Sequence, residues 1–105
     1  MTEAKYYVID EYAEKIEKRR VEILEVYESF SGWYWFITEK HGVNGSDLLE
    51  GYAYGLVIGF EKEWGEIYLP ELQELILKGK VWRVPKSNWF SISHVITKKE
   101  TPKLT

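Results

Sequence analysis

The 105-residue sequence contains no cysteine, three prolines and a single methionine. Without cysteine, neither a disulfide nor a thiolate metal site can stabilise the chain, and a reducing compartment is favoured. No run approaches the roughly 20 apolar residues that a membrane-spanning helix needs. The first residues also lack the basic and apolar segments of a signal peptide. We therefore expect a soluble, cytoplasmic protein that does not associate with membranes.

The chain also lacks the short motifs of several enzyme classes. It has no G-x-x-x-x-G-K-[ST] phosphate loop, no G-x-G-x-x-G fingerprint, no G-x-S-x-G nucleophile elbow and no histidine pair at metal-binding spacing. From these absences we expect no cofactor and no metal, and we assign no catalytic residue. A binding protein is favoured over an enzyme.

Charge is distributed unevenly along the chain. The net charge is −3, but residues 1–77 hold seven Lys/Arg against 16 Asp/Glu, a net of −9, whereas residues 78–105 have a net of +6. Such asymmetry can indicate a partner of opposite charge. Glu and Lys dominate the polar residues while Gln, Asn and Met are scarce, a composition typical of hyperthermophiles. This favours a thermophilic, archaeal source.

The N-terminal third contains apolar residues at helical spacing. Ile9, Tyr12, Ile16, Ile23 and Tyr27 follow one another at intervals of three, four or seven residues, which predicts a long helix over 10–30. Asp10 would be its N-cap, and for residues 6–9 an extension of the same helix is favoured over a short edge strand.

The middle of the chain alternates bulky and small residues. Period-two alternation predicts strands, and Pro70 and Gly79 are typical of the first turn and the end of a short helix. We expect strands over 33–38, 52–60, 65–69 and 80–84, a hairpin loop over 61–64, a helix from Pro70 to Lys78, and a strand or ordered tail over 89–96.

Together these elements predict an α+β fold. A long N-terminal helix would pack on a three- to five-stranded, mostly antiparallel sheet, and a short helix would follow the third strand. We expect one domain over 1–96, an internal loop over 41–51 and a flexible basic tail over 97–105.

Three segments of this region resemble a family of small uncharacterised proteins carried by plasmids, phages and integrated elements. The family pattern has an aromatic–Thr–Glu strand, a Phe-Gly-Leu strand, a Glu-x-Gly-aromatic strand and a Leu-x-Glu-Leu helix, and residues 35–39, 54–59 and 63–72 are similar to it. The resemblance covers about residues 33–84. The chain departs from the pattern at Lys40, where the family usually has an acidic residue. The resemblance implies a sheet-plus-helix fold in a viral or plasmid protein, and it implies no reaction.

Aromatic and acidic residues near the predicted strand ends suggest a binding surface. Trp35, Glu39, Glu63 and Trp64 are the candidates, because aromatic residues are enriched at protein interfaces. The partner would be another protein or a second copy of this chain in a homodimer. An alternative hypothesis is a small hydrolase in which Glu39 and Glu63 form an acid–base pair.

A further alternative is binding of single-stranded nucleic acid by the basic C-terminal region. Cations that hold phosphates and aromatic rings that stack on bases are what such binders use. The candidate residues are Lys80, Trp82, Arg83, Lys86 and Trp89.

Overall fold

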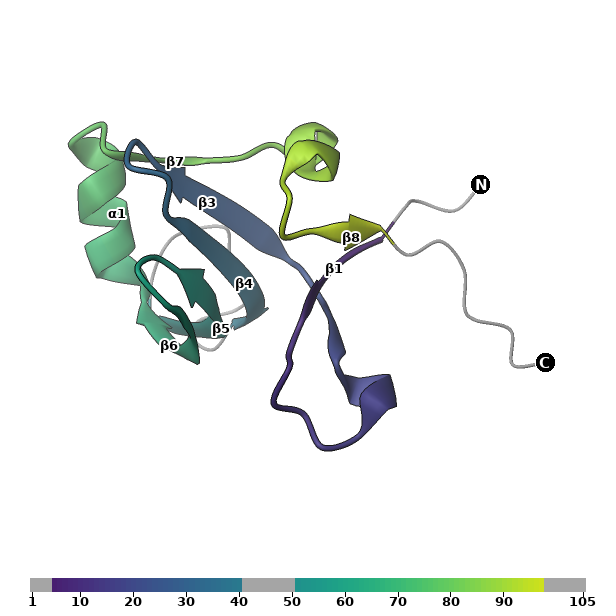
Figure 1. Ribbon diagram of the computed structural model, residues 1–105. Helices are drawn as coiled ribbons and strands as arrows, with labels where there is room; N and C mark the ends of the chain where they lie inside the picture. The colour runs from purple at the N-terminus through teal and green to yellow at the C-terminus, as the bar shows by residue number, and fades with distance from the viewer. Residues whose placement is uncertain (1–4, 41–50, 98–105) are drawn as a thin grey trace.

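The computed structural model describes residues 5–40 and 51–97, whose strands form two antiparallel sheets (Figure 1). The larger sheet has the order β6-β5-β4-β3-β7, and the smaller has the order β2-β1-β8. The larger sheet comprises β3 (Glu25–Ser29), β4 (Tyr34–Lys40), β5 (Tyr52–Ile58), β6 (Lys62–Tyr68) and β7 (Val81–Arg83). The smaller sheet comprises β1 (Tyr6–Ile9), β2 (Arg20–Glu22) and β8 (Ile96–Thr97). The helical elements are α1 (Leu69–Leu77) and the 3₁₀-helices η1 (Ile16–Lys18) and η3 (Lys86–Ser91).

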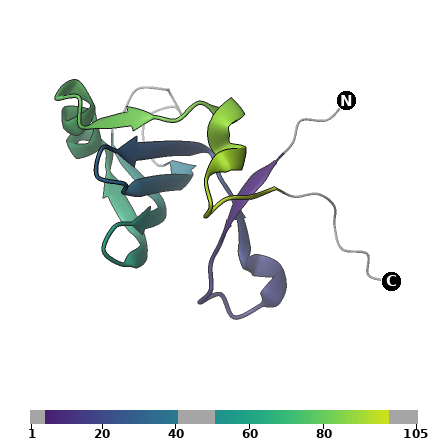
Figure 2. The ribbon, with the colours of Figure 1, turned by 45° about the horizontal axis from the view of Figure 1, so that its top comes forward.

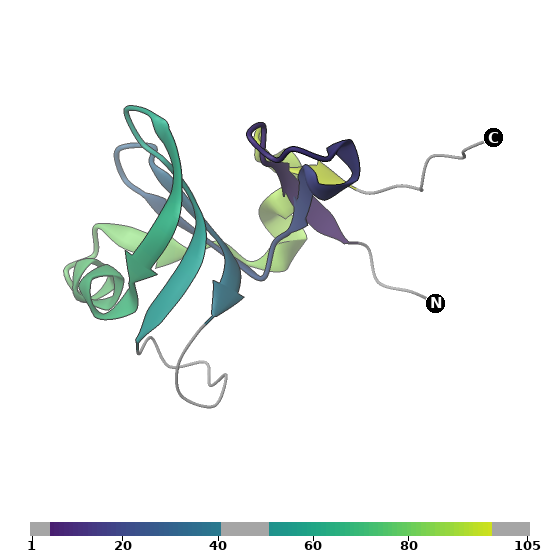
Figure 3. The same cartoon turned by 90° about the horizontal axis from the view of Figure 1, so that it is seen from below.

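The five-stranded sheet is the middle layer of the molecule. Figure 3 shows α1 on one side of it and the small sheet with η3 on the other, and Figure 2 shows the small sheet standing apart from the hairpins of the large one. A separate cluster of buried side chains fills each interface. Phe36 and Leu56 face the small sheet and pack around Trp89. Ile37 and Ala53 face α1 and pack around Leu72.

The predicted helix over 10–30 is wrong, and residues 6–9 form a strand. This region instead contains β1, η1, β2 and β3, so the fold is mostly β with one short α-helix among the described residues. The apolar stripe is divided, because Ile23 and Tyr27 are buried while Tyr12 and Ile16 are 78% and 75% exposed. Asp10 accepts a hydrogen bond through Oδ1 from the Tyr12 amide at 3.0 Å. That bond closes a turn rather than capping a helix.

The chain passes from one sheet to the other between β2 and β3. The amide of Ile23 donates to the carbonyl of Tyr6 in the small sheet at 2.9 Å, and the amide of Leu24 donates to the carbonyl of Ile37 in the large sheet at 2.7 Å. Two consecutive residues therefore hold the sheets together at this corner.

Other predictions for the middle of the chain are confirmed, with shifted boundaries. Pro70 lies in the first turn of α1, and Gly79 follows the helix with a φ of 75°, a left-handed conformation that glycine adopts without strain. β6 begins at Lys62, so the predicted 61–64 loop shrinks toward Gly59 and Glu61, whose amide and carbonyl are hydrogen-bonded at 3.1 Å.

The C-terminal strand predicted over 89–96 is largely replaced by η3. Pro85 precedes η3, and only residues from Ile96 onward pair with β1. The predicted loop over 41–51 falls outside the described residues except for Gly51, and the predicted tail does so except for Thr97. The longest helix within the described ranges is α1, with nine residues, and none there is long and apolar enough to cross a membrane.

Candidate binding site

The strand register separates the four predicted binding residues into two pairs. Paired residues of an antiparallel ladder share a face, and faces alternate along each strand. Trp35 and Glu63 both pair with Val57 and lie on the α1 face of the large sheet. Trp64 pairs with Leu56 on the opposite face, and Glu39, which follows a register shift after Ile37, also lies there.

The strand register also tests whether Glu39 and Glu63 could form the acid–base pair of a hydrolase. Glu39 pairs with Tyr54, and Glu63 pairs with Val57, so the two carboxylates are on opposite faces with β5 between their strands. Paired glycosidase carboxylates flank one substrate from within roughly 5–10 Å of each other. The structure does not bring Glu39 and Glu63 to a common site.

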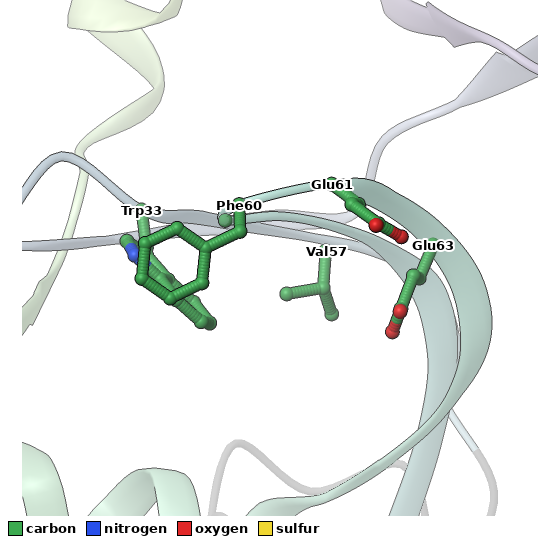
Figure 4. Close-up of a pocket in the computed structure, with 6 residues that line it drawn as sticks. Trp33, Val57, Phe60, Glu61 and Glu63 are labelled. Atoms are coloured by element: carbon green, nitrogen blue, oxygen red, sulfur yellow. The ribbon is translucent and has the colours of Figure 1, made fainter.

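A pocket opens on the α1 face at the β5–β6 turn (Figure 4). Its volume is about 300 Å³. Figure 4 shows the rings of Trp33 and Phe60 on one side of Val57 and the carboxylates of Glu61 and Glu63 on the other. The pocket therefore combines an aromatic wall, an aliphatic floor and an acidic wall.

Local sequence explains the aromatic wall. A Cβ placed on Gly59 would lie 2.6 Å from the Trp33 ring, so only glycine allows the indole to lie against this strand end. Phe60 occupies the turn and is 93% exposed, with its ring centroid 5.4 Å from that of Trp33 in an edge-to-face arrangement. An exposed ring held by a neighbouring indole is available for a ligand.

A second depression continues from this pocket between the sheet and α1. It has a volume of about 220 Å³, and Trp35, Val57, Leu72 and Glu71 are among its lining residues. Val57 lines both depressions, and the ring centroids of Trp33 and Trp35 are 6.1 Å apart. We call the combined feature the acidic groove, defined by Trp33, Trp35, Val57, Phe60, Glu61, Glu63 and Glu71.

The electrostatics of the acidic groove favour a cation. Neither depression has a lysine or arginine among the described residues that line it. The nearest lysine in sequence, Lys62, lies on the opposite face and pairs with Glu11 at 3.6 Å. Carboxylates next to aromatic faces attract positive charge both by direct Coulomb interaction and through the ring quadrupole.

A different carboxylate on the same face is already neutralised. Glu25 is 5% exposed, and its Oε2 lies 2.7 Å from the Lys40 ammonium and 3.3 Å from the Arg83 guanidinium. Its Oε1 accepts a hydrogen bond from the Tyr27 hydroxyl at 2.9 Å. This cluster joins β3, β4 and β7 and has a structural role.

The predicted nucleic-acid residues do not form one surface. Trp89 is 3% exposed and its indole N–H donates to the Val84 carbonyl at 2.9 Å, so this ring cannot stack on a base. Lys86 lies over that buried ring at 5.9 Å from its centroid. Trp82 and Arg83 are consecutive strand residues and therefore point to opposite faces.

Trp82 and Arg83 have acidic partners. Arg83 contacts the buried Glu25, and the indole N–H of Trp82 donates to Glu28 at 3.2 Å. Glu28 also accepts from the Tyr34 hydroxyl at 3.1 Å, and burial together with this charged neighbour raises the pKa of Tyr34. Lys80 is exposed after α1.

Two titratable groups meet on the small-sheet side of the large sheet. His94 contacts the Tyr34 ring, with centroids 5.9 Å apart. Burial, and to a smaller degree the positive charge of Lys62, lower the pKa of His94. In residues 5–40 and 51–97, no group of three or more His, Asp or Glu side chains is arranged to hold a metal ion.

Sequence reasoning missed five residues of the acidic groove, namely Trp33, Val57, Phe60, Glu61 and Glu71. One local signal in the sequence was the pair Gly59-Phe60, which places a glycine next to an aromatic residue at the end of the strand predicted over 52–60. Its meaning depended on Trp33, which is distant in sequence and arrives through the β4–β5 pairing.

No protein-family model, curated protein or solved structure matches the chain.

Proposed function

We propose that the chain is a small binding protein that recognises a basic segment of a protein partner. The observation that supports the proposal is the acidic groove, where two aromatic rings and two carboxylates surround one aliphatic floor. A lysine or arginine side chain matches each part of this lining. Its methylenes would pack on Val57, and its charged end would lie between the Trp33–Phe60 wall and Glu63.

The size of the pocket agrees with an occupant of this kind. About 300 Å³ is at the lower end of the range for ligand pockets, which suits a single long side chain more than a cofactor. The same lining disfavours a phosphate or a nucleic-acid backbone, since Glu61 and Glu63 would repel either of them.

Peptide binding tests the proposal directly. A lysine-rich peptide should quench or shift the fluorescence of the full chain, and a glutamate-rich peptide of the same length should not. Because the recognition is electrostatic, the affinity should fall as salt is raised. Equal binding of both peptides, or binding that does not change with salt, contradicts the proposal.

Matched variants locate the site. Phe60→Ala removes one wall of the pocket, whereas Phe90→Ala removes a similarly exposed ring from η3. From cation–π energies of about 0.5–2 kcal/mol, Phe60→Ala should raise Kd by about 2- to 30-fold, and Phe90→Ala should leave it unchanged. Glu63→Gln and the control Glu22→Gln, an exposed carboxylate of β2, make the same comparison for charge.

The biological setting remains a prediction. The resemblance of residues 33–84 to proteins of mobile elements supports a plasmid or viral adaptor, and binding of a basic partner segment is compatible with such a role.

A further inference from the structure

In residues 5–40 and 51–97, no strand pairs with the outer edge of β6 in the large sheet. The strand order ends at β6, and its seven residues make it longer than β7, β2 and β8, which lie at the other sheet edges and have three, three and two residues. Short edges are one way in which proteins prevent unwanted strand pairing. Among the described strands, β6 alone combines an edge position with this length.

The hydrogen-bonding pattern shows which groups of β6 face outward. The amide of Leu69 donates to the carbonyl of Gly51 at 2.9 Å, so this pair is hydrogen-bonded toward β5. Such pairs alternate with outward-facing ones in an antiparallel ladder. Outward backbone N–H and C=O groups therefore belong to Lys62, Trp64, Glu66 and Tyr68.

The edge lacks most of the features that usually block strand addition. It contains no proline, and its one lysine, Lys62, is at the beginning of the strand. Gly65, in the middle, has no side chain, and a Cβ built there would meet nothing within 4 Å. The path from the edge across the sheet toward the acidic groove is therefore not obstructed at Gly65.

The two faces next to this edge differ in chemistry. The α1 face presents Glu63 and the acidic groove. The opposite face presents aromatic rings: Tyr54 stacks with Trp64 at 6.0 Å between centroids, and Tyr52 contacts Tyr68 at 5.0 Å. Both tyrosine pairs include partly exposed rings.

We propose that the partner segment binds as an added strand along β6. This inference rests on the proposed function and specifies its partner: an extended segment with lysine or arginine at every second position and apolar residues between them. Basic side chains lie on the α1 face beside Glu63 and the acidic groove, and apolar side chains lie on Trp64 and Tyr68. Backbone hydrogen bonds to the outward groups of β6 supply the rest of the interaction.

A peptide pair tests the alternation. The probe is an acetylated nine-residue peptide that alternates lysine and valine, and its control has the same composition in two blocks. The alternating peptide should bind the full chain at least about tenfold more tightly, since only it places all its lysines on one face of a strand. N-methylation of alternate backbone nitrogens should reduce its affinity to that of the block peptide.

A variant pair tests the edge itself. Glu66→Pro removes an outward N–H without touching the pairing to β5, and Glu66→Ala loses the same carboxylate but keeps that N–H. Glu66→Pro should abolish the preference for the alternating peptide, whereas Glu66→Ala should retain it. Amide hydrogen exchange at Trp64 and Glu66 of the unsubstituted chain should slow when the alternating peptide binds, and exchange in β7 should not change.

The outcomes separate this inference from the proposed function. If both lysine peptides bind equally and the β6 amides gain no protection, strand addition is wrong while recognition of a basic segment stands. If neither peptide binds, both proposals fail. A concentration-dependent dimer that Glu66→Pro abolishes would identify a second copy as the occupant of the edge and overturn the proposed partner.

Discussion

The two faces of the large sheet are covered in different ways. One face is covered by β1, β2, β8 and η3, which come from both ends of the described chain and bury Val26, Phe36 and Leu56. Within the described ranges the other face is covered by α1, a helix of nine residues that reaches Ile37 and Ala53 but leaves Trp33 and Val57 in a groove. Each face has a cluster of buried side chains, and the face covered by α1 also has the candidate site.

This difference shows how a small domain can keep a recognition surface. Ala53, on the α1 face of β5, belongs to the same buried cluster as Leu72 of α1, and Gly59, which follows β5, lets the Trp33 indole lie against the backbone. Trp33, Val57 and Phe60 then line the pocket at the β5–β6 turn. The following predictions test the division between the two faces, beginning with the largest effect.

Gly55→Ala should prevent the correct pairing of β4 and β5. A Cβ at this position would overlap the carbonyl oxygen of Phe36, and backbone cannot move aside as a flexible side chain can. We expect a loss of more than about 4 kcal/mol in unfolding free energy, a large part of the stability of a small domain. Urea denaturation followed by tryptophan fluorescence measures this change in unfolding free energy. A loss below about 1 kcal/mol would show that β4 and β5 do not approach each other this closely at Gly55.

Phe36→Ala should cost more than Leu72→Ala. Phe36 is 0% exposed on the face covered by the small sheet, and its substitution should lower the unfolding free energy by about 3–5 kcal/mol. Leu72, in α1, covers the opposite face, and its loss should cost about 2–3 kcal/mol because α1 can shift toward the sheet. Equal losses in urea denaturation would mean that the two covers contribute equally.

Glu25→Gln should leave two cations beside a neutral amide. Lys40, of which 16% of the side chain is exposed, would lose its carboxylate partner, and Arg83 would lose the same contact. We expect a destabilisation of about 1–3 kcal/mol, measured by thermal unfolding at low salt. Because this cluster is separate from the acidic groove, peptide affinity should not change, and a parallel loss of affinity would contradict that separation.

His94 should make stability depend weakly on pH. Burial and Lys62 lower its pKa in the folded chain below the ordinary value of 6.5, so the unfolded chain binds more protons as pH falls through 6.5. The unfolding free energy should therefore be higher near pH 7.5 than near pH 5. His94→Gln should remove this part of the slope, which is small because His94 is only partly buried. Parallel curves for both proteins from pH 5 to 7.5 would contradict it.

The strands from β4 to β6 and α1 could be predicted because their signals are local. Alternation in 34–40 and 52–58, and the positions of Pro70 and Gly79, depend on nearby residues alone. The N-terminal third failed because Ile23 and Tyr27, four residues apart, imitate a helical repeat while lying in or next to different strands. Ile23 donates to the carbonyl of Tyr6 and Tyr27 pairs with Trp35, so partners beyond one helical turn decide their conformation.

The candidate site could be predicted only in part. Trp35 and Glu63 were found because aromatic and acidic residues near strand ends are visible in the sequence, and both line the acidic groove. Glu39 and Trp64 were placed with them because a register shift after Ile37 and the pairing of Leu56 cannot be read from composition. Trp33 and Phe60 meet only after β4 and β5 have paired.

The pairing of β1 with β8 has a consequence for synthesis on the ribosome. Tyr6 hydrogen-bonds within a ladder whose other member, Thr97, is translated roughly 5–20 s later at ordinary elongation rates. Until then Val8 has no complete cover, and the nascent chain exposes the apolar side chains of β1. Cotranslational folding should therefore begin with the strands of the large sheet, and β1 and β8 should pair last.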